Sequence, residues 1–309
     1  MKRTGLWLVV LLLIAAVAGG LIYQASRGRT DGRQDDDGGQ PTDTTGTGGK
    51  GAGVNGPSKQ AQRDPVAQAI AVATDEEQAD ADRLAALDGL RGKRLTPSQC
   101  EQVREIMGDT SVHASIRNNA VEVLIAQPRL PPGVVADLVD DWNNTNEDKT
   151  WRDFTLQFMA KAYARAGSRE QQQARKALLE AARTEESSSA GTAMLALERL
   201  GEVEPELRAQ TQAIAVEVYQ DGSVPARQIT AVAIAARAGH EDLLPFARKT
   251  AADTAARARL RTACIAAIGG LGNEDDVALL ERLAQAGDTR VKQAAAYQLK
   301  ELRQRVSAN

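Results

Sequence analysis

The sequence predicts an all-α fold, an α-solenoid of stacked antiparallel helix pairs, over residues 64–309. Aromatic residues make up only 3% of the 309-residue chain and alanine is abundant, a composition that suits closely packed helices. Glycines close apolar segments at positions 167, 201, 239 and 272, at spacings of 34, 38 and 33 residues. Two helices in every 31–38 residues, with different caps at alternating turns, are typical of helical repeats.

The chain begins with a predicted membrane segment, residues 1–26. Residues 4–26 carry no charge, and the apolar part, residues 6–23, would form a helix about 27 Å long, close to the thickness of a bilayer core. Trp7 and Tyr23 lie near its ends, where amphipathic rings favour the interface. We expect a single-pass anchor with the repeats outside the cytoplasm. The alternative is a signal peptide cleaved after Ala18, which would give a secreted or periplasmic protein.

The composition of residues 27–63 predicts a disordered linker. Glycine, aspartate and threonine dominate this stretch, so it cannot bury enough apolar surface to offset the entropy of ordering it. We expect it to tether the repeats to the membrane segment.

From residue 64 onward the sequence predicts helices throughout. Weaker helices are expected in 65–91. First helices of each pair are then expected at 97–107, 131–142, 168–182, 205–219, 240–251 and 273–284, and second helices at 114–124, 149–159, 188–201, 224–234, 258–268 and 289–299. Each glycine named above is expected to end its helix with a left-handed backbone. Asp109, Asp253 and Asp288 are expected to accept hydrogen bonds from the free N–H groups of the helices that follow them.

A basic residue lies early in most second helices, and the last repeat shows it most clearly. Residues 288–302, DTRVKQAAAYQLKEL, resemble the HEAT-repeat pattern of an aspartate, a valine with a basic residue, then alanines and a leucine. Residues 272–299 resemble a whole unit of the short bacterial, phycobilisome-lyase-type HEAT-like repeats, and the similarity extends over residues 95–302. The resemblance implies that the second helices line the concave side. It then places on one ridge Arg117, Arg152, Arg227, Arg261 and Lys292, with Ala190 in the remaining unit.

This ridge has two interpretations. With Trp142 it would form a partner-binding surface for an acidic protein. Alternatively, each base bonds to an aspartate or a carbonyl of a neighbouring turn and stiffens the stack. Trp151 and Phe158 follow helical spacing and predict a core stripe, whereas Trp142, at a helix end beside polar residues, is expected to be exposed. Cys100 and Cys264 are expected to be buried thiols, a single disulfide being the alternative.

Composition argues against several functions. A net charge of −3 and a pI near 5.6 give no basic surface for nucleic acid. The chain is similar in fold to HEAT-like enzymes such as deoxyhypusine hydroxylase, which carry several His-Glu pairs for a di-iron centre. It has only two histidines and one such pair, His240-Glu241, at a turn. We therefore expect no metal, no cofactor, no small-molecule substrate and no catalytic residue.

These observations predict a membrane-tethered HEAT-repeat scaffold or adaptor that mediates protein–protein interactions and has no catalytic activity. The first alternative is a HEAT-like lyase-type enzyme or a protein that handles a chromophore or cofactor. The second is a structural spacer in an envelope assembly.

Overall fold

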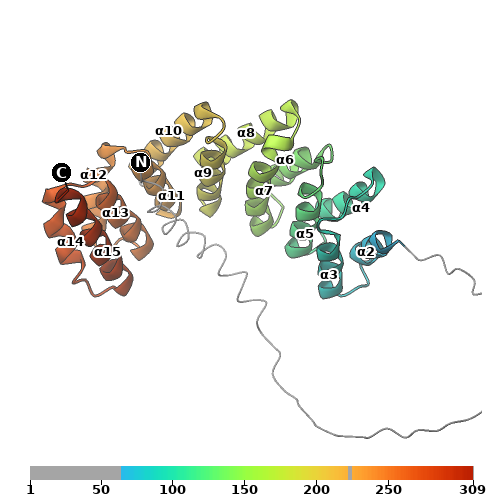
Figure 1. Ribbon diagram of the computed structural model, residues 1–309, viewed down its shortest axis with the longest axis horizontal. Coiled ribbons are helices and arrows are strands. Elements are labelled where there is room, and N and C mark those ends of the chain that lie inside the picture. The colour runs from blue at the N-terminus through green and yellow to red at the C-terminus, as the bar shows by residue number, and fades with distance from the viewer. Residues whose placement is uncertain (1–63, 222–224, 309) are drawn as a thin grey trace, which may run out of the picture. The chain divides into compact units, whose positions relative to one another are not determined.

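The computed structural model describes residues 64–221 and 225–308, and the regular elements of these residues are all helices (Figure 1). They are α2 (Pro65–Thr74), α3 (Asp80–Leu90), α4 (Pro97–Gly108), α5 (Ala114–Ile125), α6 (Val134–Asn143), α7 (Lys149–Ala162), η1 (Tyr163–Arg165), α8 (Ser168–Thr184), α9 (Ser188–Leu200), α10 (Pro205–Asp221), α11 (Pro225–Arg237), η2 (Glu241–Leu243), α12 (Leu244–Ala252), α13 (Ala258–Leu271), η3 (Glu274–Asp276), α14 (Val277–Leu283) and α15 (Thr289–Val306). The all-helical prediction is therefore confirmed for these residues.

The predicted membrane segment and linker, residues 1–63, lie outside the described residues and stay predictions. Among the helices of residues 64–221 and 225–308, none has both the length and the apolar composition that a membrane span requires.

Within the described part of the chain, consecutive helices pack as seven pairs, from α2 with α3 to α14 with α15. The second helix of each pair also contacts the second helix of the next pair, so α3, α5, α7, α9, α11, α13 and α15 form a continuous series (Figure 1). Helix α3 is thus the second helix of a full first pair, which the sequence indicated only as weak helices. This arrangement is consistent with an α-solenoid, in which each pair buries its apolar face against its neighbours.

The core contains the predicted aromatic stripe. Trp151 and Phe158 on α7 are buried, and Phe154 packs against the same core. Trp142 was expected to be exposed, and this prediction was wrong, because the residue is only 5% exposed. The reason is a tertiary contact: the Arg152 guanidinium lies 4.3 Å from the centre of the Trp142 ring and covers it. Cys100 and Cys264 are buried free thiols, as predicted.

The predicted glycine caps are only partly correct. Gly239 has the left-handed backbone that the prediction required, with φ at 80°. The other three have negative φ angles, and two of them are confined by a close approach instead. A Cβ at position 201 would lie 2.9 Å from the backbone of Arg208, and one at position 272 would lie 2.5 Å from the carbonyl oxygen of Ile268. These turns therefore select glycine for its size.

The aspartate caps also differ from one another. Asp288 accepts from the N–H groups of Arg290 and Val291, so it caps α15 as predicted. Asp109 and Asp253 instead accept from residues within the preceding turn, because α5 and α13 begin several residues further along the chain.

Candidate functional site

A repeated arginine contact joins the two helices of several pairs. Near the start of the second helix, the arginine Nε donates to a backbone carbonyl ten residues earlier, at the end of the first helix. The donors and acceptors are Arg83 to Ala73 at 3.0 Å, Arg117 to Met107 at 2.7 Å, Arg152 to Trp142 at 3.0 Å and Arg261 to Ala251 at 3.1 Å. The final carbonyls of a helix have no partner within that helix, and a cation near them is favourable. These arginines therefore act as clasps between paired helices, which agrees with the second interpretation of the ridge.

The other pairs vary this contact. In α11 the side chain of Gln228, one residue after Arg227, donates to the Tyr219 carbonyl at 3.2 Å. Arg227 instead donates to the Arg183 carbonyl and pairs with Asp221. The predicted register is therefore wrong by one residue in this helix. Arg83 is also a basic residue early in a second helix, but it was not among the predicted ridge residues, because the resemblance to HEAT repeats begins only at residue 95.

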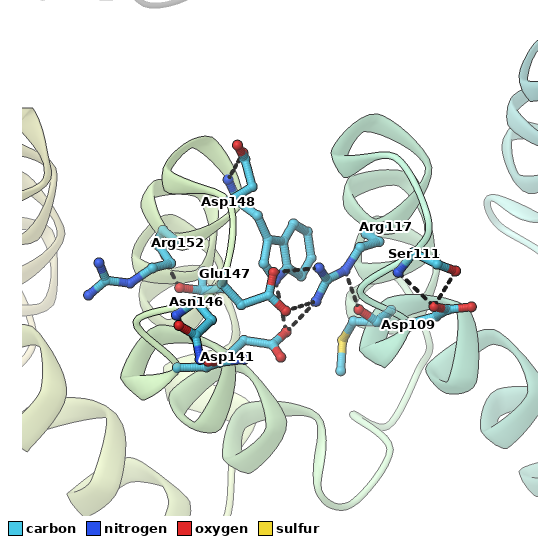
Figure 2. A network of polar contacts seen from close by, with 12 residues as sticks. Asp109, Ser111, Arg117, Asp141, Asn146, Glu147, Asp148 and Arg152 are labelled. Atoms are coloured by element: carbon cyan, nitrogen blue, oxygen red, sulfur yellow. Dashed lines mark hydrogen bonds and ion pairs between the residues drawn. The ribbon is translucent and has the colours of Figure 1, made fainter.

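The arginine clasp is most elaborate at Arg117, where it forms a buried polar cluster (Figure 2). The Arg117 guanidinium donates to both oxygens of Glu147, at 2.9 and 3.1 Å, and to Asp141 at 3.1 Å. It also lies 4.2 Å from the centre of the Trp151 ring, whose Nε1 donates to Asp141 at 2.9 Å. Helices α4, α5, α6 and α7 all contribute to this cluster, so it fixes the second pair to the third.

The cluster holds two carboxyl groups and one cation in a place with little water. The side chains of Arg117, Glu147 and Asp141 are 2%, 3% and 15% exposed. The pKa of Asp141 is raised to about 6, chiefly by burial. The hydrogen bond from Trp151 and the charge of Arg117 oppose this rise, and the negative charges of Glu147 and Asp137 add to it. Such a perturbed carboxyl group is a feature of many functional sites, but here all its partners also join packed helices.

Replacing Asp141 with asparagine is expected to change how stability depends on pH. The pKa of Asp141 is about 6 in the folded protein, above the ordinary value of 3.8 for an aspartate. This group therefore stabilises the fold fully below pH 3.8 and loses that contribution as pH rises through 6. Because asparagine does not ionise, Asp141→Asn removes this loss of stability at higher pH. Relative to wild type, the variant should gain about 2–3 kcal/mol between pH 4 and pH 8 in urea unfolding followed by circular dichroism.

The matched control for this variant is Asp140→Asn, which removes an exposed carboxylate from the same helix. Its effect on the free energy of unfolding should stay within about 0.5 kcal/mol. If the free energies of unfolding of wild type and Asp141→Asn differed by a constant amount from pH 4 to pH 8, the raised pKa of Asp141 would be contradicted.

Further arginines link one pair to the next. Arg104 on α4 binds both carboxylate oxygens of Asp137 on α6, and Arg248 on α12 binds both oxygens of the buried Asp276 at 2.7 and 2.9 Å. Arg305 at the end of α15 donates to the Gly269 carbonyl at 2.8 Å and to two neighbouring carbonyls of the α13 end. Sequence reasoning missed these links, because it does not show which charges on neighbouring helices meet.

The predicted partner-binding ridge is therefore not one open surface. Arg117, Arg261 and Trp142 are buried, and Arg152 and Arg227 are partly buried and bonded within the fold. Lys292 occupies the corresponding place on α15 and is exposed, because α15 is the last helix of the described stack. A role for Lys292 in binding a partner stays a prediction.

An exposed basic surface lies elsewhere, along α8. A shallow groove of about 720 Å³ follows this helix. Arg169, Lys176 and Arg183 are exposed along it, and their side chains make no hydrogen bond or ion pair with any residue in the described part of the chain. The rest of the groove is lined by Gln172, Gln173, Arg175, Leu179, Glu180 and Thr184. Arg175 differs from the three free bases, because it pairs with Glu204.

Residues 64–221 and 225–308 contain no group of three or more histidine, cysteine, aspartate or glutamate side chains arranged to hold a metal ion. In particular, His240 lies at the turn between α11 and η2, as the sequence indicated.

The sequence and the structure were compared with known proteins. No protein-family model matches the sequence, and no curated protein matches it. Among solved structures, the chain is similar to human deoxyhypusine hydroxylase in complex with glycerol. The sequence identity is 14%, the TM-score is 0.37, and the match covers 77% of this chain and 96% of that one.

This finding corrects the functional prediction. The similar structure is that of an enzyme, whereas the sequence was expected to encode a scaffold or adaptor without catalytic activity. The enzyme alternative drawn from the sequence stays open. A likeness of this degree concerns the fold, and it assigns no reaction, substrate or metal to the present chain.

Proposed function

We propose that this chain is a HEAT-like α-solenoid that binds an acidic polypeptide along α8. The HEAT-like assignment is supported by the repeated sequence pattern and by the arginine clasp that recurs from pair to pair. The binding proposal rests on a single observation, the three exposed bases of α8 that have no acidic partner among the described residues.

The three free bases contrast with several arginines that pair within the fold. Arg104, Arg117, Arg175, Arg237 and Arg248 each meet a carboxylate of a neighbouring helix or turn. Arg169, Lys176 and Arg183 instead keep their charge available to a ligand, and among the described residues that line the groove Glu180 is the only acid. Arginine and lysine bind carboxylates through charge-assisted hydrogen bonds. A polypeptide rich in aspartate or glutamate therefore suits this surface.

The proposal concerns recognition, and it applies to a catalytic and to a non-catalytic protein alike. If the chain is an enzyme, the bound polypeptide is its substrate, and if it is not, the polypeptide is its partner. Three bases are too few for a nucleic acid, whose binding requires an extended basic surface.

Reversing the three charges, as Arg169→Glu, Lys176→Glu and Arg183→Glu in one variant, is expected to weaken the binding of acidic polypeptide. The probe is fluorescein-labelled poly-L-glutamate, titrated with the full-length chain and read by fluorescence anisotropy. We expect the dissociation constant to rise at least about tenfold, since each exposed ion pair contributes up to about 1 kcal/mol. Added salt should weaken binding to the wild-type chain.

The matched control is Lys300→Glu, which reverses an exposed base on α15 that likewise has no partner among the described residues. It should leave binding unchanged. Equal binding by the triple variant and by wild type would overturn the proposal, and the circular dichroism spectrum of each variant shows that it is folded.

A further inference from the structure

The free bases of α8 are spaced at regular intervals along the helix. Arg169, Lys176 and Arg183 are each seven residues apart in a continuous helix. A rise of about 1.5 Å per residue places successive bases about 10.5 Å apart, and the outer two about 21 Å apart. Seven residues are close to two helical turns, so the three side chains follow one stripe.

The spacing of side chains along one face of a bound polypeptide depends on the conformation of that polypeptide. In an extended strand, side chains on one face recur about every 6.7 Å. One such step of about 6.7 Å is shorter, and two steps of about 13.4 Å are longer, than the distance of about 10.5 Å between successive bases of α8. A polyproline II segment repeats about every 9.3 Å and falls short by about 2.4 Å over two intervals. A second α-helix with carboxylates seven residues apart repeats at about 10.5 Å and matches both intervals.

The residues between the bases also suit a helix. Leu179 is partly buried and packs against the core while lining the groove, between Lys176 and Arg183. Gln172 and Gln173 lie between Arg169 and Lys176. An apolar position flanked by charges at seven-residue spacing is the arrangement by which paired helices combine hydrophobic contact with interhelical ion pairs.

We propose that α8 binds an acidic α-helix of its partner, one that presents glutamate or aspartate at positions i, i+7 and i+14 and an apolar side chain toward Leu179. This inference rests on the proposed function. Glu180 then adds specificity, because it repels a carboxylate and favours a basic or neutral residue at the facing position.

The test compares three labelled peptides of equal length and net charge, each titrated with the full-length chain. The first is a helical peptide with glutamates at i, i+7 and i+14 and a leucine between the last two. The second has the same composition, with the glutamates redistributed around the helix. The third contains prolines, which keep it extended while its glutamates recur at every third position. Circular dichroism measures the helix content of each peptide.

We expect the first peptide to bind at least tenfold more tightly than the other two. Glu180→Lys should strengthen its binding, and Leu179→Ala should weaken it. Equal affinity for all three peptides, abolished by the triple charge reversal, would overturn the helix inference and leave the proposed function intact. Tighter binding of the proline-containing peptide would also overturn it. Binding of all three peptides that the triple reversal does not weaken would overturn both proposals.

Discussion

Arg117→Ala is expected to lower the free energy of unfolding by about 3–5 kcal/mol, the largest effect of any single substitution considered. The variant leaves Glu147 and Asp141 buried without their cation, because the Arg117 side chain supplies three of their hydrogen bonds. It also leaves the Met107 carbonyl without its donor. Urea unfolding at pH 7.5, followed by circular dichroism, measures the change.

Two equivalent positions serve as graded controls for this variant. Arg261 makes the same clasp to Ala251 but no ion pair with a carboxylate of the described residues, so Arg261→Ala should cost about 1–3 kcal/mol, the cost of an unpartnered buried carbonyl. Lys292 is exposed on α15, and Lys292→Ala should change stability by less than about 0.5 kcal/mol. If the three variants were equally stable, the buried cluster would have no special energetic role.

Gly269→Ala is expected to destabilise the fold by about 1–3 kcal/mol, because it forces α13 and α15 apart. A Cβ at position 269 would lie 1.9 Å from the Oε1 atom of Gln298 and 2.8 Å from its Cβ. The oxygen can rotate away, but the Gln298 Cβ is fixed by the α15 backbone, so the helix itself must move. The same unfolding measurement reports this cost.

Gly270→Ala provides the adjacent control. Position 270 lies in the same helix and faces open space, so a methyl group there meets no atom within 4 Å. Alanine favours the helix over glycine, so this variant should gain up to about 1 kcal/mol. A loss of stability at both positions would show that the close approach of α13 and α15 is not the cause.

Much of the fold could be predicted from the sequence, because each helix pair is encoded locally. Apolar spacing placed the helices from α4 to α14 within about four residues of their bounds, whereas α15 runs seven residues past the expected range of 289–299. Local pattern does not fix where a helix starts, and this explains the error of one residue at Arg227 and Gln228. It also does not show what covers a side chain from another helix, and so Trp142 was expected to be exposed.

The candidate site was less predictable. The seven-residue spacing of Arg169, Lys176 and Arg183 is visible in the sequence, but 38 basic residues occur in the chain and spacing alone does not select these three. What distinguishes them is that they lie together along one groove of α8, exposed and without an acidic partner among the described residues, and this depends on where the neighbouring helices lie. Conversely, Arg117 was a candidate for partner binding until the structure showed its carboxylates inside the fold.

The reach of the arginine links has a consequence for how the chain folds. The clasps join residues ten apart, and the widest separation among the hydrogen bonds of the described residues is 44, little more than one repeat. Low contact order favours rapid folding, since only short loops must close before contacts form. A pair can therefore fold as soon as its immediate neighbour provides a surface, and order can spread along the stack from any folded pair.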